Sequence, residues 1–170
     1  MSTMNKPDAS AGDHAADSEQ TPRLPPRWFI RSAWVLHRAL LRLSRGQIGL
    51  RPPEAGVRFG MLRLTTVGRR SGQPRTAIVG YYEDGPNLVT LAMNGWAEAE
   101  PAWWLNLQAQ PDTIVELNDG PRAVRGRAAE GEERERLWAR WREFSGDYDA
   151  WAAMRPVRTA VVVLEPRAAA

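Results

Sequence analysis

Alternating apolar and polar residues, or short apolar runs, recur along the chain and predict β-strands. In the clearest stretch Leu62, Leu64 and Thr66 fall on one face, and the residues between them fall on the other. Turns with hairpin chemistry, each containing Asp-Gly-Pro, lie at residues 83–86 and 118–121. The expected strands are residues 60–67, 74–82, 87–93, 113–118, 122–129 and 159–164.

Helical signals occur between these strands. A helix at 101–110 would begin at Pro101, a residue that favours the first helical turn. Residues 131–144 are acidic at first and rich in arginine later, which suits the helix dipole, and a short helix is expected at 147–154. Six mostly antiparallel strands with interspersed helices indicate an α+β fold with a barrel-like sheet.

A further helix is expected at residues 27–45, and its arginines lie on one side. At 100° per residue they fall in a sector about 60° wide, beside a broad apolar surface. They are Arg27, Arg31, Arg38, Arg42 and Arg45. Such a helix can lie on an anionic membrane or pack on its own domain, and both alternatives stay open. The predicted organisation is a disordered acidic tail at 1–22, this basic helix within 23–50, and a main domain at 58–166.

Composition removes several classes of site. The chain has no cysteine and only two histidines, His14 and His37, so a thiolate or histidine-rich metal site is not expected. No apolar run is long enough to span a bilayer, and the acidic N-terminal stretch lacks the layout of a signal peptide. Of 23 basic residues only Lys6 is a lysine, and the formal net charge is +3, so an anionic ligand or surface is plausible.

The loop between the first two strands is the clearest candidate binding site. Two glycines allow positive φ and a close approach of the backbone to a ligand. A hydroxyl, three guanidiniums and the loop N–H groups suit phosphate or carboxylate. The loop consists of Gly68, Arg69, Arg70, Ser71, Gly72, Gln73, Pro74 and Arg75. A solvated, basic hairpin tip is the alternative interpretation.

Three stretches in the right order resemble one known family. Residues 66–75, TVGRRSGQPR, resemble the T-x-G-[RK]-[RK]-[ST]-G-x-x-R signature of deazaflavin-dependent nitroreductase and quinone reductase proteins. Residues 95–107, GWAEAEPAWWLNL, are similar to the family's G-x-x-x-x-x-P-x-W-x-x-N-L, and residues 159–166, TAVVVLEP, to its closing strand. Together they cover about residues 60–166.

The resemblance implies a split β-barrel that binds coenzyme F-420, a deazaflavin with a phosphate and an oligoglutamate tail. Arg69, Arg70 and Arg75 would pair with the phosphate and the tail carboxylates, while Ser71 and the Gly72 N–H would add hydrogen bonds. Further residues matching cofactor-lining positions are Gln73, Pro74, Thr76, Pro101, Ala102, Trp103 and Asn106. For Trp103 ordinary core packing is the alternative.

The implied activity is hydride transfer from the reduced cofactor to a quinone, a nitroaromatic compound or a similar conjugated acceptor. Tyr148 matches a family tyrosine over the substrate pocket, so it is the candidate catalytic residue as a proton donor. Three residues depart from the family pattern: Met93 near the ring, Glu100 before Pro101, and Trp151 where a tyrosine is common. These departures affect the acceptor more than the cofactor class.

Two other classes of protein are alternatives to a deazaflavin-dependent enzyme. A related split barrel could use its arginines to hold the phosphate of flavin mononucleotide (FMN) or the propionates of haem. An arginine-rich nucleic-acid binder would need aromatic residues exposed between the arginines, whereas most tryptophans here have core-like spacing. The expected protein is therefore a cytoplasmic oxidoreductase, with possible contact to the inner face of the membrane through residues 27–45, and with no nucleic-acid partner.

Overall fold

The computed structural model describes residues 49–95 and 98–168. The acidic tail expected at 1–22 and the basic helix expected at 27–45 lie outside these residues and stay predictions. Within the described part, no helix is long and apolar enough to cross a membrane.

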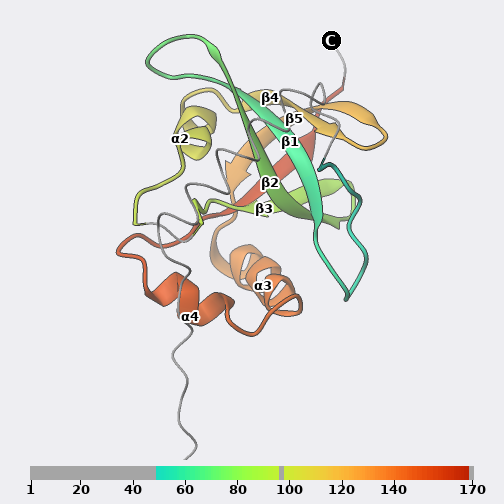
Figure 1. Cartoon of the computed structure of the whole chain (residues 1–170), viewed down its shortest axis with the longest axis vertical. Coiled ribbons are helices and arrows are strands. Elements are labelled where there is room, and N and C mark those ends of the chain that lie inside the picture. Colours follow the sequence, from blue (N-terminus) through green and yellow to red (C-terminus); the bar gives the residue numbers. More distant parts are fainter. Residues whose placement is uncertain (1–48, 96–97, 169–170) are drawn as a thin grey trace, which may run out of the picture.

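Six strands form a closed barrel in the order β1-β2-β3-β6-β5-β4, and all neighbouring strands are antiparallel (Figure 1). They are β1 (Gly60–Val67), β2 (Pro74–Asp84), β3 (Asn87–Leu91), β4 (Asp112–Leu117), β5 (Gly120–Ala128) and β6 (Val161–Pro166). The register of β1 with β2 runs from Gly60 opposite Tyr81 to Val67 opposite Pro74, which leaves residues 68–73 as the connecting loop. The predicted barrel of antiparallel strands is confirmed.

β1 has the expected ends, and the ends of the other strands differ from the expected ones by at most two residues, in two cases for reasons that lie in local backbone pairing. β3 ends at Leu91 and not at residue 93, because the Met93 N–H turns back to donate to the Leu91 carbonyl at 2.8 Å. β5 begins earlier than expected, because Leu117 pairs with Gly120 across a two-residue turn. Gly120 has φ 129°, a conformation that glycine adopts readily.

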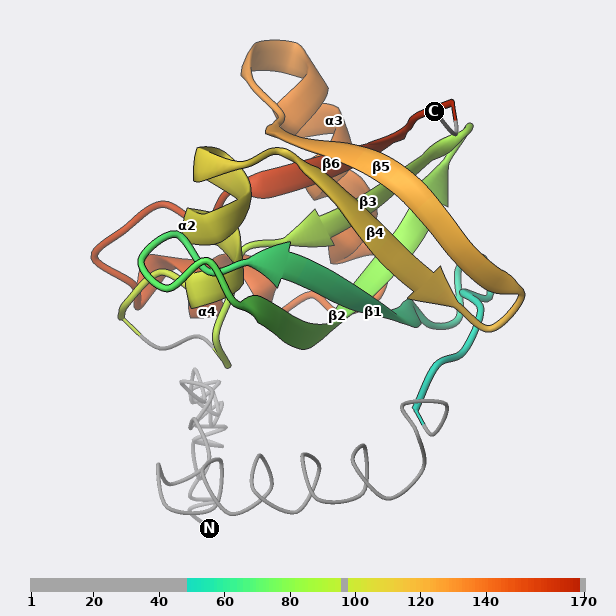
Figure 2. The same cartoon turned by 90° about the horizontal axis from the view of Figure 1, so that it is seen from above.

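The barrel core follows the alternation in β1. Leu62 and Leu64 are fully buried, and Val67 at the strand end points outward. Helix α2 (Ala102–Ala109) packs against the barrel next to the β1–β2 loop (Figure 2). Its buried Leu107 lies directly over Gly126 of β5, where an added Cβ would be 2.7 Å from the Leu107 Cγ. A glycine at this position therefore lets α2 approach the sheet.

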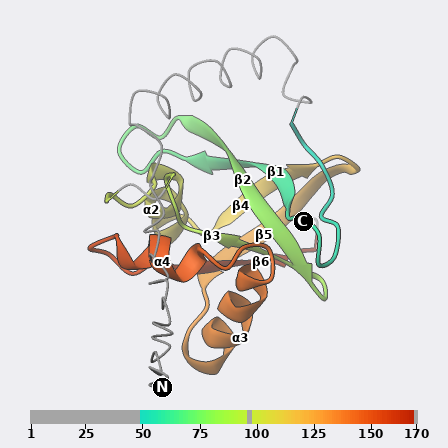
Figure 3. The same ribbon diagram turned by 60° about the horizontal axis from the view of Figure 1, so that its bottom comes forward.

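A second apolar cluster lies on the outer side of β3 and β6, under helices α3 (Gly131–Arg142) and α4 (Tyr148–Ala153) (Figure 3). Its buried members are Tyr82, Val89, Leu91, Ala129, Leu137, Trp138, Trp141, Tyr148, Val161 and Val163. Both helices were predicted from the sequence, with ends one or two residues longer. The tryptophans of α2 therefore belong to the barrel core, whereas those of α3 belong to the outer cluster.

Candidate functional site

The loop at residues 68–73 is a tight turn held by its own backbone. The Gly68 N–H donates to the Gln73 carbonyl at 2.8 Å, and the Gly68 carbonyl accepts from both Ser71 N–H and Gly72 N–H, at 3.1 and 2.7 Å. Gly72 has φ 65°, and a Cβ on Gly68 would lie 2.7 Å from the Ser71 Oγ. Both glycines of the motif are thus required by the shape of this loop.

Asn106 on α2 joins the loop to the helix. Its Oδ1 accepts a hydrogen bond from the Arg69 N–H at 3.1 Å, and its Nδ2 donates to the Thr66 Oγ1 at 3.2 Å. Thr66 in turn donates through its Oγ1 to the Arg75 carbonyl at 3.3 Å. Asn106 and Thr66 are 4% and 2% exposed. Two sequence motifs that match the family separately therefore meet in one buried hydrogen-bond network.

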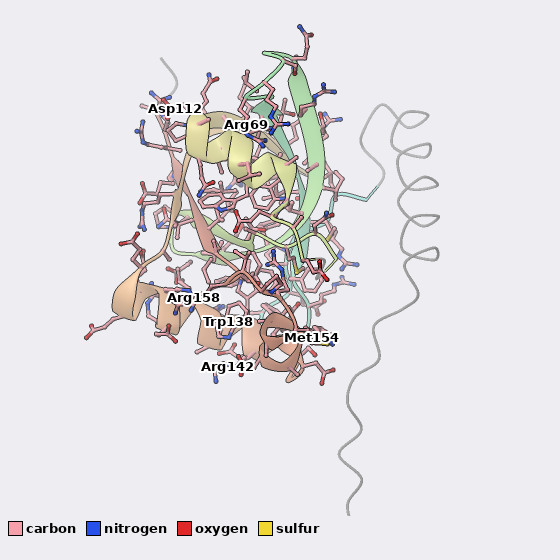
Figure 4. The ribbon with its side chains drawn as sticks, turned by 90° about the vertical axis from the view of Figure 1, so that its left-hand side faces the viewer. Arg69, Asp112, Trp138, Arg142, Met154 and Arg158 are labelled. Atoms are coloured by element: carbon pink, nitrogen blue, oxygen red, sulfur yellow. The ribbon has the colours of Figure 1, made fainter. Side chains whose placement is uncertain are left out.

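Three arginine side chains extend from this loop and its edge into solvent: Arg69, Arg70 and Arg75. Figure 4 shows Arg69 beside α2. None of the three forms an ion pair with a carboxylate of the described residues, whereas most other arginines of the barrel and its helices do. Arg75 places its Nη2 3.5 Å from the Ser71 Oγ. The loop is therefore a cluster of positive charge open to an anionic ligand.

The backbone donors of the loop contribute less to such a site than the sequence predicts. The Gly72 N–H, expected to reach a ligand, donates to the Gly68 carbonyl instead. The Gln73 N–H is directed at the Ser71 Oγ at 3.4 Å. Among the N–H groups of residues 68–73, that of Arg70 has no acceptor in the described part of the chain. An anion would thus meet guanidiniums, the Ser71 hydroxyl and the Arg70 N–H.

Other expected cofactor contacts surround the loop in different environments. Gln73, Pro74 and Thr76 are exposed at the start of β2. Pro101 is buried and immediately precedes α2, and Ala102 in the first turn is exposed. Trp103, 7% exposed, belongs to the barrel core and contacts Trp104 with ring centroids 6.3 Å apart. The structure thus shows core packing for Trp103, and its contact with a cofactor stays a prediction.

Tyr148 lies in the outer aromatic cluster, away from the cluster that contains Trp103. It is 4% exposed, and its ring centroid lies 5.7 Å from that of Trp141 and 5.6 Å from that of Trp151. Burial raises the pKa of the Tyr148 phenol to about 12. Met93 also packs against this cluster. Two of the residues that depart from the family pattern, Met93 and Trp151, therefore lie in the same cluster as Tyr148.

Arg155 is a buried residue that sequence reasoning missed. It is 6% exposed, and its guanidinium donates to the Ala92 carbonyl at 3.1 Å, the Thr159 Oγ1 at 2.6 Å and the Ala99 carbonyl at 3.4 Å. These bonds tie the segment that leads to Pro101 to the exit of α4. In a chain with so many arginines nothing in the sequence marks this one as buried.

The described residues contain no group of three or more His, Cys, Asp or Glu side chains that could hold a metal ion. The chemistry available to this part of the chain is therefore that of arginines, hydroxyls and amides around the loop, with aromatic side chains on both sides of the sheet. The exposed arginines of the loop can bind an anion.

Comparison with known proteins identifies the family. Residues 35–166 match the family model described as F420H(2)-dependent quinone reductase, a range that includes the loop, α2 and β6. The chain belongs to this family. A curated relative, the F420H(2)-dependent quinone reductase of Mycobacterium tuberculosis strain H37Rv, is 39% identical over 100 residues. That match covers 56% of this chain and 64% of the relative's length.

Solved structures support the same fold. A structure described as an F420-H2 dependent reductase (FDR-A) superposes with a TM-score of 0.56 at 26% identity, covering 62% of this chain and 93% of that one. A second, described as a domain-swapped dimer, has a TM-score of 0.57 at 24% identity and covers 79% and 99% of the two chains. The split β-barrel implied by the sequence motifs is confirmed.

Proposed function

We propose that this member of the family binds reduced coenzyme F-420 and passes its hydride to a quinone or a similar conjugated acceptor. The observation that carries the proposal is the charged loop, where Arg69, Arg70 and Arg75 are exposed and have no carboxylate partner among the described residues. The names of the relative and of the superposed reductase agree with this cofactor.

The donors around the loop fit the anionic part of that cofactor. Guanidinium groups form two-pronged hydrogen bonds with phosphate and carboxylate, and such charge-assisted bonds are stronger than neutral ones. Arg70 has both an exposed side chain and the N–H of residues 68–73 that has no acceptor among the described residues. The Ser71 hydroxyl adds a donor next to the Arg75 guanidinium. When bound, the reduced deazaflavin supplies the hydride.

The remaining work of the protein is to hold the acceptor and keep water away. We assign Tyr148 as the hydrogen-bond donor to the acceptor oxygen, because it matches a tyrosine that the family resemblance places over the substrate pocket. The apolar side chains around it, Met93 and Trp151, suit a flat, apolar acceptor better than a charged one. A quinone is such an acceptor.

A peripheral contact with the cytoplasmic face of the membrane is part of the proposal. It is supported by the arginine spacing of residues 27–45 in the sequence and by the solubility of quinones in lipid. Each basic residue near an anionic surface contributes about 1 kcal/mol to binding, and salt screens this contribution.

Titration of the full chain with oxidised coenzyme F-420, followed by fluorescence, tests the cofactor. Turnover of the reduced cofactor is then measured with a quinone, a nitroaromatic compound and an enone. Saturable binding of F-420 together with quinone turnover is the expected result. Tight binding of FMN or haem without binding of F-420 would overturn the proposal.

A further inference from the structure

We infer that Asn106 is a positioning residue of the anion-binding loop and not a direct ligand of the cofactor. This inference rests on the proposed function, since it assigns a role within the same site. The family motif alone makes Asn106 a candidate for cofactor contact, but the structure shows both polar atoms of its amide in use within the protein.

The orientation of the amide is fixed by its partners. A backbone N–H can only donate, so the Asn106 oxygen must face Arg69 and the nitrogen must face Thr66. Asn106 is 4% exposed, and leaving the Arg69 N–H without its acceptor would cost free energy. The amide keeps a second N–H and a second lone pair, but at 4% exposure little of it is open to a ligand. The hydrogen bonds of the amide therefore hold the loop and the end of β1.

The network reaches both limbs of the loop. Asn106 holds the Arg69 backbone on the outgoing limb, and Thr66 holds the Arg75 carbonyl on the returning limb, at 3.3 Å. Arg70 lies between these two anchored positions. The Arg69 backbone is thus bonded directly to α2, the Arg75 backbone is bonded to it through Thr66, and α2 packs on the barrel through Leu107 over Gly126.

Such an arrangement lowers the cost of binding a charged tail. A free loop would lose conformational entropy when it closes on a phosphate, whereas a loop already held by α2 has lost most of that entropy on folding. Removal of the Asn106 amide should therefore weaken contacts to the phosphate and tail and leave contacts to the deazaflavin ring unchanged. A residue that touched the ring would have the opposite effect.

The test compares two ligands on the full chain: coenzyme F-420, and the same deazaflavin chromophore without phosphate and tail. Asn106→Leu removes both hydrogen bonds at nearly constant volume, and Gln108→Leu is the matched control, because Gln108 is exposed on the same helix. We expect Asn106→Leu to weaken F-420 binding roughly tenfold, because the loop must then be ordered when the tail binds, with less than a twofold change for the tail-less ligand. Gln108→Leu should change neither.

Hydrogen exchange gives a readout that needs no ligand. In Asn106→Leu the Arg69 amide should exchange roughly tenfold faster than in the wild type, because its acceptor is gone. If that variant does not fold, Thr66→Val and Thr66→Ser supply the same comparison, since only serine keeps the hydroxyl between Asn106 and Arg75.

Equal losses for both ligands would make Asn106 a ring contact and overturn the inference. Unchanged F-420 binding with unchanged Arg69 exchange would overturn it as well. Failure of the proposed function looks different: the wild-type protein would then bind F-420 no more tightly than the tail-less chromophore, while the Arg69 exchange still responded to Asn106→Leu.

Discussion

Replacing Arg70 by alanine is the sharpest perturbation of the proposed anchor. Arg70 is exposed and has no carboxylate partner in the described part of the chain, so its truncation breaks no internal ion pair and should leave the melting temperature within about 2 °C of the wild type. A hydrogen bond to a charged group contributes about 1.5–3 kcal/mol. Solvent exposure places Arg70 near the lower value, which corresponds to a roughly tenfold weaker dissociation constant for F-420.

The control is Arg122→Ala, which removes the same charge far from the loop. Figure 2 shows the β4–β5 turn that precedes Arg122 at the opposite end of the barrel from the β1–β2 loop. Arg122 pairs only with the exposed Asp119, at 2.7 Å, among the described residues, and such a surface pair contributes little to stability. At 0.1 M salt charges more than about 10 Å apart are largely screened, so this variant should bind F-420 within about twofold of the wild type.

Fluorescence titration of F-420 at two salt concentrations decides between the outcomes. If Arg70 pairs directly with the cofactor, Arg70→Ala should bind F-420 more weakly than the wild type. Arg70→Lys should recover only part of the lost affinity, because lysine lacks the planar guanidinium. Arg122→Ala should bind F-420 as the wild type does. Equal affinities for Arg70→Ala and the wild type, or equal losses for Arg70→Ala and Arg122→Ala, would refute the anchor.

Five further outcomes are expected. Tyr148→Phe should lower quinone turnover at unchanged F-420 affinity, and unaltered turnover with every acceptor would make Tyr148 a pocket wall only. Because burial raises the Tyr148 pKa to about 12 from 10.0, the folded state keeps this proton longer than the unfolded state. Stability is therefore lost as the pH rises from 10 to 12, and Tyr148→Phe should lose less of it in pH-dependent melting. Gly126→Ala should destabilise by about 1–3 kcal/mol in urea, whereas Gly146→Ala, with no atom within 4 Å of the added Cβ, should not. Arg155→Met should also destabilise by about 1–3 kcal/mol, because it strips three acceptors of their buried donor. The full chain should sediment with anionic vesicles at low salt and not with neutral ones, and deletion of residues 1–46 should abolish this while sparing F-420 binding.

The strands could be predicted because their burial follows the backbone period of two. In β1 every second side chain is buried, and the Asp-Gly turns mark where the next strand begins. What could not be predicted are the contacts that decide where a strand stops. The return of Met93 N–H to Leu91 depends on the chain turning away towards α2, which no local pattern reports.

The site was predictable as a set of residues but not as a geometry. Three motifs indicated the cofactor class, and Thr66, Arg69 and Asn106 appear in two of them. That they share one hydrogen-bond network depends on the packing of α2 against the barrel. Which loop N–H groups are consumed internally, as for Gly72, depends on the fold of the loop itself. No sequence pattern marked Arg155 as buried, because which of many arginines becomes buried depends on the tertiary packing.

The two aromatic clusters and the charged loop divide the work that the proposed reaction requires. The anionic tail of the cofactor needs exposed cations, and the loop offers three that have no carboxylate partner among residues 49–95 and 98–168. The proposal places the acceptor beside Tyr148, whose neighbours in the outer cluster are mostly apolar. Arg155 connects the segment before Pro101 with the exit of α4, because its guanidinium donates hydrogen bonds to the Ala92 and Ala99 carbonyls. A change of acceptor preference should therefore come from residues packed around Tyr148, such as Met93 and Trp151, while changes in the loop alter cofactor affinity alone.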